Sequence, residues 1–119
     1  GIEAVTAFWK SRGLNTDEVF MTDGSGLSRA SSLTPHFQAA LLCKIYRDSN
    51  NYKIINASLP AAGLQGSMAS LGRGSFIQNN LRAKTGYLTR VRAYCGYVKT
   101  KRGEVLAFSI IFNNFNCSP

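Results

Sequence analysis

Apolar residues recur at helical spacing near the start of the chain, at Ile2, Val5 and Phe8 or Trp9. This spacing predicts a helix over residues 2–12, and the following Gly13 is a natural residue to end it. The large side chains Phe8 and Trp9 are expected to belong to the core.

A second helix is predicted to begin at Thr34-Pro35, because threonine caps a helix N-terminus well and proline fits its first turn. The polar run Asp48-Ser49-Asn50-Asn51 is typical of a turn and is expected to end this helix. Its buried face would consist of Phe37, Ala40, Leu41 and Ile45, with Tyr46 also in the core.

The last third of the chain alternates in the manner of strands, predicted over residues 80–85, 91–100 and 104–113. Lys101-Arg102-Gly103 would form the short hairpin loop between the last two. A short strand is also predicted over Val19–Met21, and the glycine-rich stretch 59–74 is expected to form loops with short helical pieces. Helices followed by an antiparallel meander predict an α+β fold.

The length of 119 residues and mass of 13.0 kDa correspond to one domain or less. Hydrophobic residues make up 45% of the chain, which excludes a disordered protein. No apolar run approaches the roughly 20 residues of a transmembrane helix, so no transmembrane segment is expected. The first residues also lack the basic-then-apolar pattern of a signal peptide.

Fourteen lysine and arginine residues against six acidic residues give a net charge of +8. Half of the basic residues lie between positions 82 and 102. This balance suits an anionic partner, so one hypothesis is a basic module that binds nucleic acid or an anionic cell-wall polymer. The alternative is a solvated hairpin whose charges prevent edge pairing. Nucleic acid is the less favoured partner, because the basic strands lack the interleaved aromatic residues of RNA-binding sheets.

Cysteine and histidine residues give no pattern for a metal or a disulfide framework. The three cysteines are widely spaced, and Cys43 and Cys95 in their apolar surroundings are expected to be small core residues. The single histidine, His36, is expected at the surface. Calcium is a poor match for the Asp23-Gly24-Ser25-Gly26 stretch, because a calcium site takes six to eight oxygen ligands and acidic residues are scarce. No metal or other cofactor is therefore expected.

Three blocks of sequence carry the strongest functional signal. The first is Thr22-Asp23-Gly24-Ser25-Gly26-Leu27-Ser28-Arg29, the second is the run of residues 59–68 beginning Leu59-Pro60-Ala61-Ala62-Gly63, and the third begins Arg82-Ala83-Lys84-Thr85-Gly86-Tyr87. In this order they resemble the C-terminal part of bacterial D-alanyl-D-alanine carboxypeptidases and endopeptidases of the class C penicillin-binding group, the penicillin-binding protein 4 type. The resemblance covers nearly all of the chain.

The resemblance implies a serine acyl-transfer site in which Lys-Thr-Gly lies on a strand that lines the catalytic cleft. Lys84 would supply positive charge and relay a proton, Thr85 would contact the terminal carboxylate of the substrate, and Gly86 would leave room for it. The backbone N–H of Tyr87 would complete the oxyanion hole, although the family commonly has threonine at this position. Four residues of the first block would hold the site in place without touching the substrate, by bonding nearby backbone or carboxylate groups: Asp23, Ser25, Ser28 and Arg29.

Two other motifs of the family, Ser-x-x-Lys and Ser-x-Asn, are expected to lie before Gly1. No serine here has a lysine three positions later, and Ser49-Asn50-Asn51 is interpreted as a turn rather than as the family motif. Residues 1–119 are thus expected to form a C-terminal part of the penicillin-binding/β-lactamase-like transpeptidase fold, with helices packed on an antiparallel sheet. Because the nucleophile and its base are missing, this chain alone is expected to be inactive.

The resemblance also implies the partners and the location of the parent enzyme. Peptidoglycan stem peptides and β-lactams would be its ligands, and it would act in the periplasm or elsewhere outside the cytoplasm. The missing family segments, including a helix after the last strand, would leave part of the sheet uncovered. Self-association of the isolated chain is therefore expected.

Overall fold

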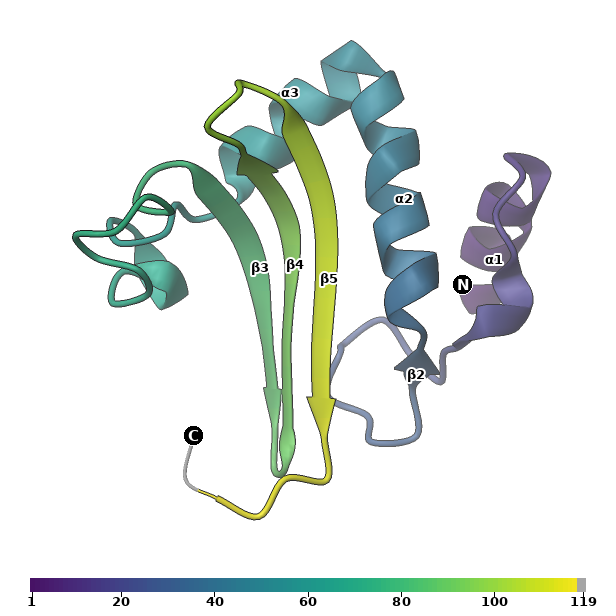
Figure 1. Cartoon of the computed structure of the whole chain (residues 1–119). Coiled ribbons are helices and arrows are strands. Elements are labelled where there is room, and N and C mark those ends of the chain that lie inside the picture. Colours follow the sequence, from purple (N-terminus) through teal and green to yellow (C-terminus); the bar gives the residue numbers. More distant parts are fainter. Residues whose placement is uncertain (118–119) are drawn as a thin grey trace.

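The computed structural model describes residues 1–117. The main sheet has three strands. Figure 1 shows helices on one side of it and an irregular segment beside the opposite edge. The elements, in chain order, are α1 (Ile2–Ser11), η1 (Thr16–Glu18), β1 (Val19–Phe20), β2 (Ser32–Leu33), α2 (Pro35–Arg47), α3 (Ser49–Ser58), η2 (Gly66–Met68), β3 (Leu81–Leu88), β4 (Val91–Lys99) and β5 (Val105–Asn113). This arrangement is α+β, as predicted.

The main sheet is an antiparallel meander in the order β3-β4-β5. Its register pairs Lys84 with Cys95 and Cys95 with Ser109, so these three side chains lie in one row on the same face. The predicted hairpin after β4 is confirmed, with Gly103 at φ 84°, a conformation that few other residues adopt.

Helix α2 packs on the face of the sheet that carries this row, alongside β5 (Figure 1). The hydroxyl of Ser109 donates a hydrogen bond of 2.7 Å to the Gln38 side chain. The hydroxyl of Tyr97, in the central strand, donates one of 2.7 Å to the backbone carbonyl of Leu42. Of the predicted helix face, Phe37 is buried and Ala40, Leu41 and Ile45 are half-buried, whereas the second buried residue, Leu42, was not predicted.

The segment between α3 and β3 extends the edge of the sheet and covers part of the other face. Ala61 pairs with Arg82 in an isolated antiparallel bridge at this edge. Met68 is completely buried against Ala62 and Ala83. Partly buried hydrophobic residues pack around this cluster: Ile77, Leu81, Tyr94 and Phe108. The irregular middle of the chain therefore provides the tightest part of the core.

The polar run at residues 48–51 does not form the predicted turn. Asp48 instead caps a third helix, α3, by accepting a hydrogen bond of 3.2 Å from the Asn51 N–H. Ser49-Asn50-Asn51 is thus the first turn of a helix. Asx residues suit a cap as well as a turn, so the sequence pattern alone did not separate the two.

Several residues that were expected in the core are accessible. Cys43 is exposed, and Phe8 and Tyr46 keep 46% and 45% of their surface accessible, whereas Trp9 and Cys95 are half-buried. For Phe8 the reason is the position of α1, which lies on the far side of α2 from the sheet (Figure 1). No helix among residues 1–117 is both long and apolar enough to cross a bilayer.

Candidate active site

The site centres on the outer edge of β3, where backbone groups point away from the sheet. Next to the segment at 60–62, the Leu81 carbonyl accepts a bond of 2.8 Å from the Ala62 N–H, and the Ala83 N–H donates one of 3.2 Å to the Pro60 carbonyl. Backbone groups alternate in direction along a strand, so the N–H and C=O groups of Thr85 and Tyr87 point toward this same edge. Beyond Ala83 the edge thus presents backbone donors and acceptors at Lys-Thr-Gly.

Lys84-Thr85-Gly86 lies in the interior of β3, whereas the sequence pattern had placed it at the end of a strand. The ammonium group of Lys84 donates a hydrogen bond of 2.6 Å to the Thr85 carbonyl, which brings its positive charge to the open edge. Gly86 is exposed, and a Cβ atom there would lie 3.4 Å from the nearest atom, the Ala93 Cβ. The strand therefore offers a cation, a hydroxyl and an unobstructed backbone within three residues.

The side chains of this strand divide between the two faces of the sheet. Lys84 and Gly86 share the face covered by α2, while Thr85 and Tyr87 share the opposite face. The Thr85 hydroxyl donates a hydrogen bond of 3.0 Å to the Ser67 hydroxyl, from η2. The Tyr87 ring is stacked under the Arg92 guanidinium at 4.2 Å, which holds the ring to the side of the strand.

A groove of about 430 Å³ runs between β3–β5 and the loop that joins β1 to β2. Of the predicted site residues, Gly86, Tyr87, Ser28 and Arg29 line this groove. Lys84, Thr85, Asp23 and Ser25 are not among its lining residues. The structure therefore brings the first and third sequence blocks together at one groove, with the Lys84 ammonium at the neighbouring strand edge.

The loop at residues 21–31 is held by its own side chains. Asp23 accepts hydrogen bonds from the N–H and the hydroxyl of Ser25, at 2.9 and 2.7 Å. The Ser25 hydroxyl accepts one from the Leu27 N–H, and the Ser28 hydroxyl accepts one from the Ala30 N–H. The bonds from the Ser25 hydroxyl and N–H hold the pKa of the Asp23 carboxyl below its ordinary value. These bonds lie within the loop itself, and the supporting role predicted for the block stays a prediction.

Arg29 joins this loop to the sheet. Its guanidinium donates a hydrogen bond of 3.4 Å to the carbonyl of Thr89, in the turn between β3 and β4. The partner is a backbone carbonyl rather than the carboxylate that the sequence suggested. This contact spans 60 residues of sequence and fixes the loop beside the end of β3.

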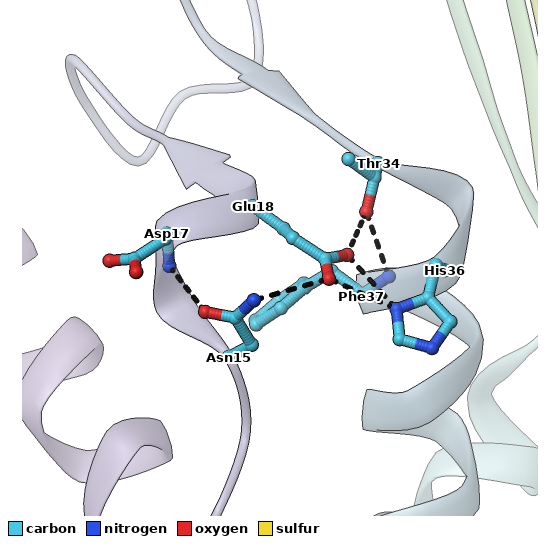
Figure 2. Close-up of polar contacts among 6 residues, drawn as sticks. All are labelled: Asn15, Asp17, Glu18, Thr34, His36 and Phe37. Atoms are coloured by element: carbon cyan, nitrogen blue, oxygen red, sulfur yellow. Dashed lines mark hydrogen bonds and ion pairs between the residues drawn. The ribbon is translucent and has the colours of Figure 1, made fainter.

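The base of the same loop is held by Glu18 (Figure 2). Its carboxylate accepts hydrogen bonds from the Thr34 hydroxyl and, at 3.4 Å, from the Asn15 amide, while the His36 Nδ1 lies 3.1 Å from both carboxylate oxygens. The Thr34 hydroxyl in turn accepts a bond of 3.0 Å from the Phe37 N–H and so caps α2. One carboxylate thereby ties η1 to the start of α2, and the loop that lines the groove lies between these two points.

The hydrogen bonds to Glu18, above all the one from Thr34, hold the pKa of its carboxyl below the ordinary value. Among residues 1–117, His36 and Glu18 are the one basic side chain and carboxylate within salt-bridge distance, and the contact is an ion pair only with the His36 ring protonated. His36 is exposed, as predicted, yet it has this specific partner. No pattern in the sequence had indicated Glu18.

The Cys95 thiol lies in the same row of the sheet as Lys84 and is a further reactive group near the open edge of β3. Burial raises the pKa of the Cys95 thiol, an effect that the charge of the nearby Lys84 only partly offsets, so this thiol stays protonated. No three His, Cys, Asp or Glu residues in the range 1–117 lie close enough together to hold a metal ion. Among residues 1–117 the structure therefore offers neither a thiol of lowered pKa beside Lys84 nor a cluster of metal ligands.

Comparison with known proteins assigns this arrangement to a family. Residues 1–119 match the D-Ala-D-Ala carboxypeptidase 3 (S13) family. The chain is 35% identical to the D-alanyl-D-alanine carboxypeptidase of Actinomadura sp. strain R39 over 124 residues, which is 100% of this chain and 22% of the relative.

Solved structures agree with this match. Penicillin-binding protein 4 from Haemophilus influenzae superposes with a TM-score of 0.90 at 27% identity, over 99% of this chain and 26% of that chain. The same protein in complex with a β-lactam superposes with a TM-score of 0.88 at 27% identity, over 98% of this chain and 27% of that one. The chain thus spans about a quarter of the length of these relatives. With the whole sequence matched and the fold shared, the chain belongs to the D-Ala-D-Ala carboxypeptidase 3 (S13) family.

Proposed function

We propose that this chain is the C-terminal part of the catalytic domain of a serine D-Ala-D-Ala carboxypeptidase or endopeptidase, and that it contributes the Lys-Thr-Gly strand of the active site. The observation that carries the proposal is the open edge of β3. There the Lys84 ammonium and the outward backbone groups of Thr85 and Tyr87 lie within one short stretch of strand.

In this proposal each residue of the strand has a distinct task. A peptide substrate lies along the open edge, where its backbone pairs with β3, and exposed Gly86 leaves room for it. The Tyr87 N–H points at the substrate carbonyl and stabilises the negative charge that develops on its oxygen. One such donor typically contributes on the order of 3 kcal/mol of transition-state stabilisation. Because the donor is a backbone group, tyrosine can replace the usual threonine.

Lys84 and Thr85 act on charge. The positive charge of the Lys84 ammonium stabilises anionic groups at the edge. The same group relays a proton during the attack by the serine. The Thr85 hydroxyl binds the terminal carboxylate of the peptide. Asp23, Ser25, Ser28 and Arg29 keep the groove wall in place through the contacts described above.

The attacking serine and its base belong, in this proposal, to another part of the polypeptide, since no serine here has a lysine three positions later. Residues 1–119 alone should therefore not form an acyl-enzyme. The substrates are peptidoglycan stem peptides, with β-lactams as inhibitors, and the enzyme works outside the cytoplasm, where peptidoglycan is assembled. The support for β-lactam binding is the relative from Haemophilus influenzae that was solved with one.

The test is covalent labelling with a fluorescent penicillin, applied to the isolated chain and to the full-length gene product. The full-length protein should label and the isolated chain should not. Lys84→Ala in the full-length protein should lower the labelling rate at least a hundredfold, while Lys53→Ala, at an exposed lysine on α3, should leave it unchanged. A full-length protein that never labels would refute the proposal.

A further inference from the structure

The hydroxyl groups of Thr85 and Ser67 lie 3.0 Å apart, although 18 residues separate them in the sequence. Ser67 is part of the second sequence block, to which the site described so far gives no role. Its position next to the Lys-Thr-Gly strand makes it a residue whose chemistry can affect substrate binding.

Ser67 is held firmly in place by its neighbours. The side chain of Met68 is completely buried against Ala62 and Ala83. The Met68 carbonyl accepts a hydrogen bond of 2.9 Å from the Gly63 N–H, and its N–H donates one of 3.0 Å to the Gln65 carbonyl. The Ser67 side chain itself is exposed. The buried core thus fixes the backbone of η2, while the hydroxyl stays accessible beside the edge of β3.

A hydroxyl group carries one proton, which limits what Thr85 can do alone. When its proton points to Ser67, Thr85 has none to offer an anion. When Ser67 donates to Thr85 instead, the Thr85 proton is free to point outward, and the donated bond polarises the Thr85 hydroxyl and strengthens the bond that it makes. The direction of this one hydrogen bond therefore decides whether Thr85 can bind a carboxylate.

We propose that Ser67 is a positioning residue that orients and polarises the Thr85 hydroxyl as a donor to the terminal carboxylate of the substrate, which makes the pair a selector for peptides with a free carboxylate. This inference rests on the proposed function of the strand. With substrate bound, the order of donation is Ser67 to Thr85 and Thr85 to the carboxylate, with the Lys84 ammonium adding its positive charge at the same edge.

The experiment compares two competitors of fluorescent penicillin labelling in the full-length protein: a peptide ending in D-Ala-D-Ala with a free carboxylate, and the same peptide as a C-terminal amide. The measured quantity is the ratio of the concentrations that halve the labelling rate. In the Ser67→Ala variant the preference for the free carboxylate should fall about tenfold, because the Thr85 hydroxyl keeps its proton but loses the donated bond that orients and polarises it. Ser67→Thr keeps a hydroxyl and should restore the preference.

Two further variants separate this role from a structural one. Ser67→Asp places a negative charge beside Thr85. This should weaken binding of the peptide with a free carboxylate far more than binding of the amide. Ser70→Ala, at an exposed serine on the same segment, should leave the ratio unchanged. A merely structural role would affect both peptides equally. If the unsubstituted protein labels and Ser67→Ala keeps the full preference, the inference is wrong, whereas a protein that does not label at all refutes the proposed function itself.

Discussion

The hydroxyl of Tyr97 donates a hydrogen bond of 2.7 Å to the backbone carbonyl of Leu42, and this bond joins the central strand β4 to α2. Both residues are buried, with 3% and 6% of their surface accessible. The ring of Tyr52, from α3, meets the Tyr97 ring edge-on at 5.0 Å. One residue of the sheet thus holds both helices that cover this face, including the helix whose start supports the groove.

We expect Tyr97→Phe to lower the free energy of unfolding by about 1 to 2 kcal/mol, because the Leu42 carbonyl loses a buried partner. Urea denaturation of the isolated chain measures this change. Tyr94→Phe is the matched control, since Tyr94 is half-buried on the opposite face. Equal losses in the two variants would mean that the hydrogen bond is not what stabilises the helix against the sheet.

Stability should also fall in strongly alkaline solution because of Tyr97. The pKa of Tyr97 is raised from 10.0 to about 12, and burial of the side chain is the main cause of this shift. The unfolded chain releases this proton near pH 10, whereas the folded chain holds it. The contribution is therefore complete below pH 10 and is lost as the pH rises toward 12. Unfolding free energies measured across this range should fall less steeply in Tyr97→Phe, and an unchanged slope would contradict the assignment.

Gly96 should tolerate no side chain, in contrast to Gly86 on the neighbouring strand. A Cβ atom at Gly96 would lie 2.0 Å from the Arg82 carbonyl oxygen and 2.8 Å from the Ala83 Cα, both backbone atoms that have little freedom to move. We expect Gly96→Ala to cost about 3 kcal/mol or more. Circular dichroism and thermal denaturation of both variants test this.

Gly86→Ala is the control for that substitution. Its Cβ would meet only the Ala93 Cβ, at 3.4 Å, so the isolated chain should fold nearly as well as before. If the proposed function is correct, the same substitution in the full-length protein should slow penicillin labelling, because the proposal has the substrate lie against the strand at Gly86. Normal folding of Gly96→Ala would show that the two strands can separate locally.

The carboxylate of Glu18 should make the groove wall sensitive to acid. Its pKa is held below the ordinary value of 4.5, mainly by the Thr34 hydroxyl. The stabilisation is therefore present above pH 4.5 and is lost as the pH falls through the lower pKa of the folded state. The protection of the Phe37 amide, which Thr34 caps, measured as its hydrogen-exchange rate relative to the intrinsic rate at the same pH, should decrease in that range.

Glu18→Gln should remove most of this pH dependence and should speed exchange at Phe37 already at neutral pH. Asp23 has a lowered pKa as well, so Asp23→Asn serves as the comparison: it should change exchange in the loop without affecting the Phe37 amide. Unchanged protection of Phe37 in Glu18→Gln would show that α2 is capped without help from this carboxylate.

The isolated chain should self-associate through the uncovered face of the sheet. On the face opposite α2, Leu106, Ile110 and Phe112 keep 52%, 45% and 56% of their surface accessible, and they form a row along β5. Contiguous apolar surface of this kind favours association. Sedimentation velocity over a range of concentrations should show oligomers of the isolated chain. Ile110→Ser should weaken the association, while Ile54→Ser, at an exposed position on α3, should not. A monomer at every concentration would refute this prediction.

Much of the architecture follows from local pattern. The alternation of the last third predicted β4 and β5 within one residue of their observed ends, and Thr34-Pro35 marked the start of α2. These signals are local: a strand with one buried face must alternate, and a cap needs its hydroxyl next to the first turn. The helix α3 was missed because its Asp48 cap has the same residue type as a turn.

The family and the Lys-Thr-Gly strand were also readable from the chain alone, since short motifs keep their order and spacing in the sequence. Their surroundings were not. The contacts between Thr85 and Ser67, between Arg29 and Thr89, and between Glu18 and Thr34 join segments 16 to 60 residues apart. Burial is equally non-local, which is why Phe8 and Cys43 were wrongly expected in the core. Linear order specifies the elements and the reactive groups, but only packing decides which groups meet, because proximity depends on how the whole sheet and its helices enclose one another.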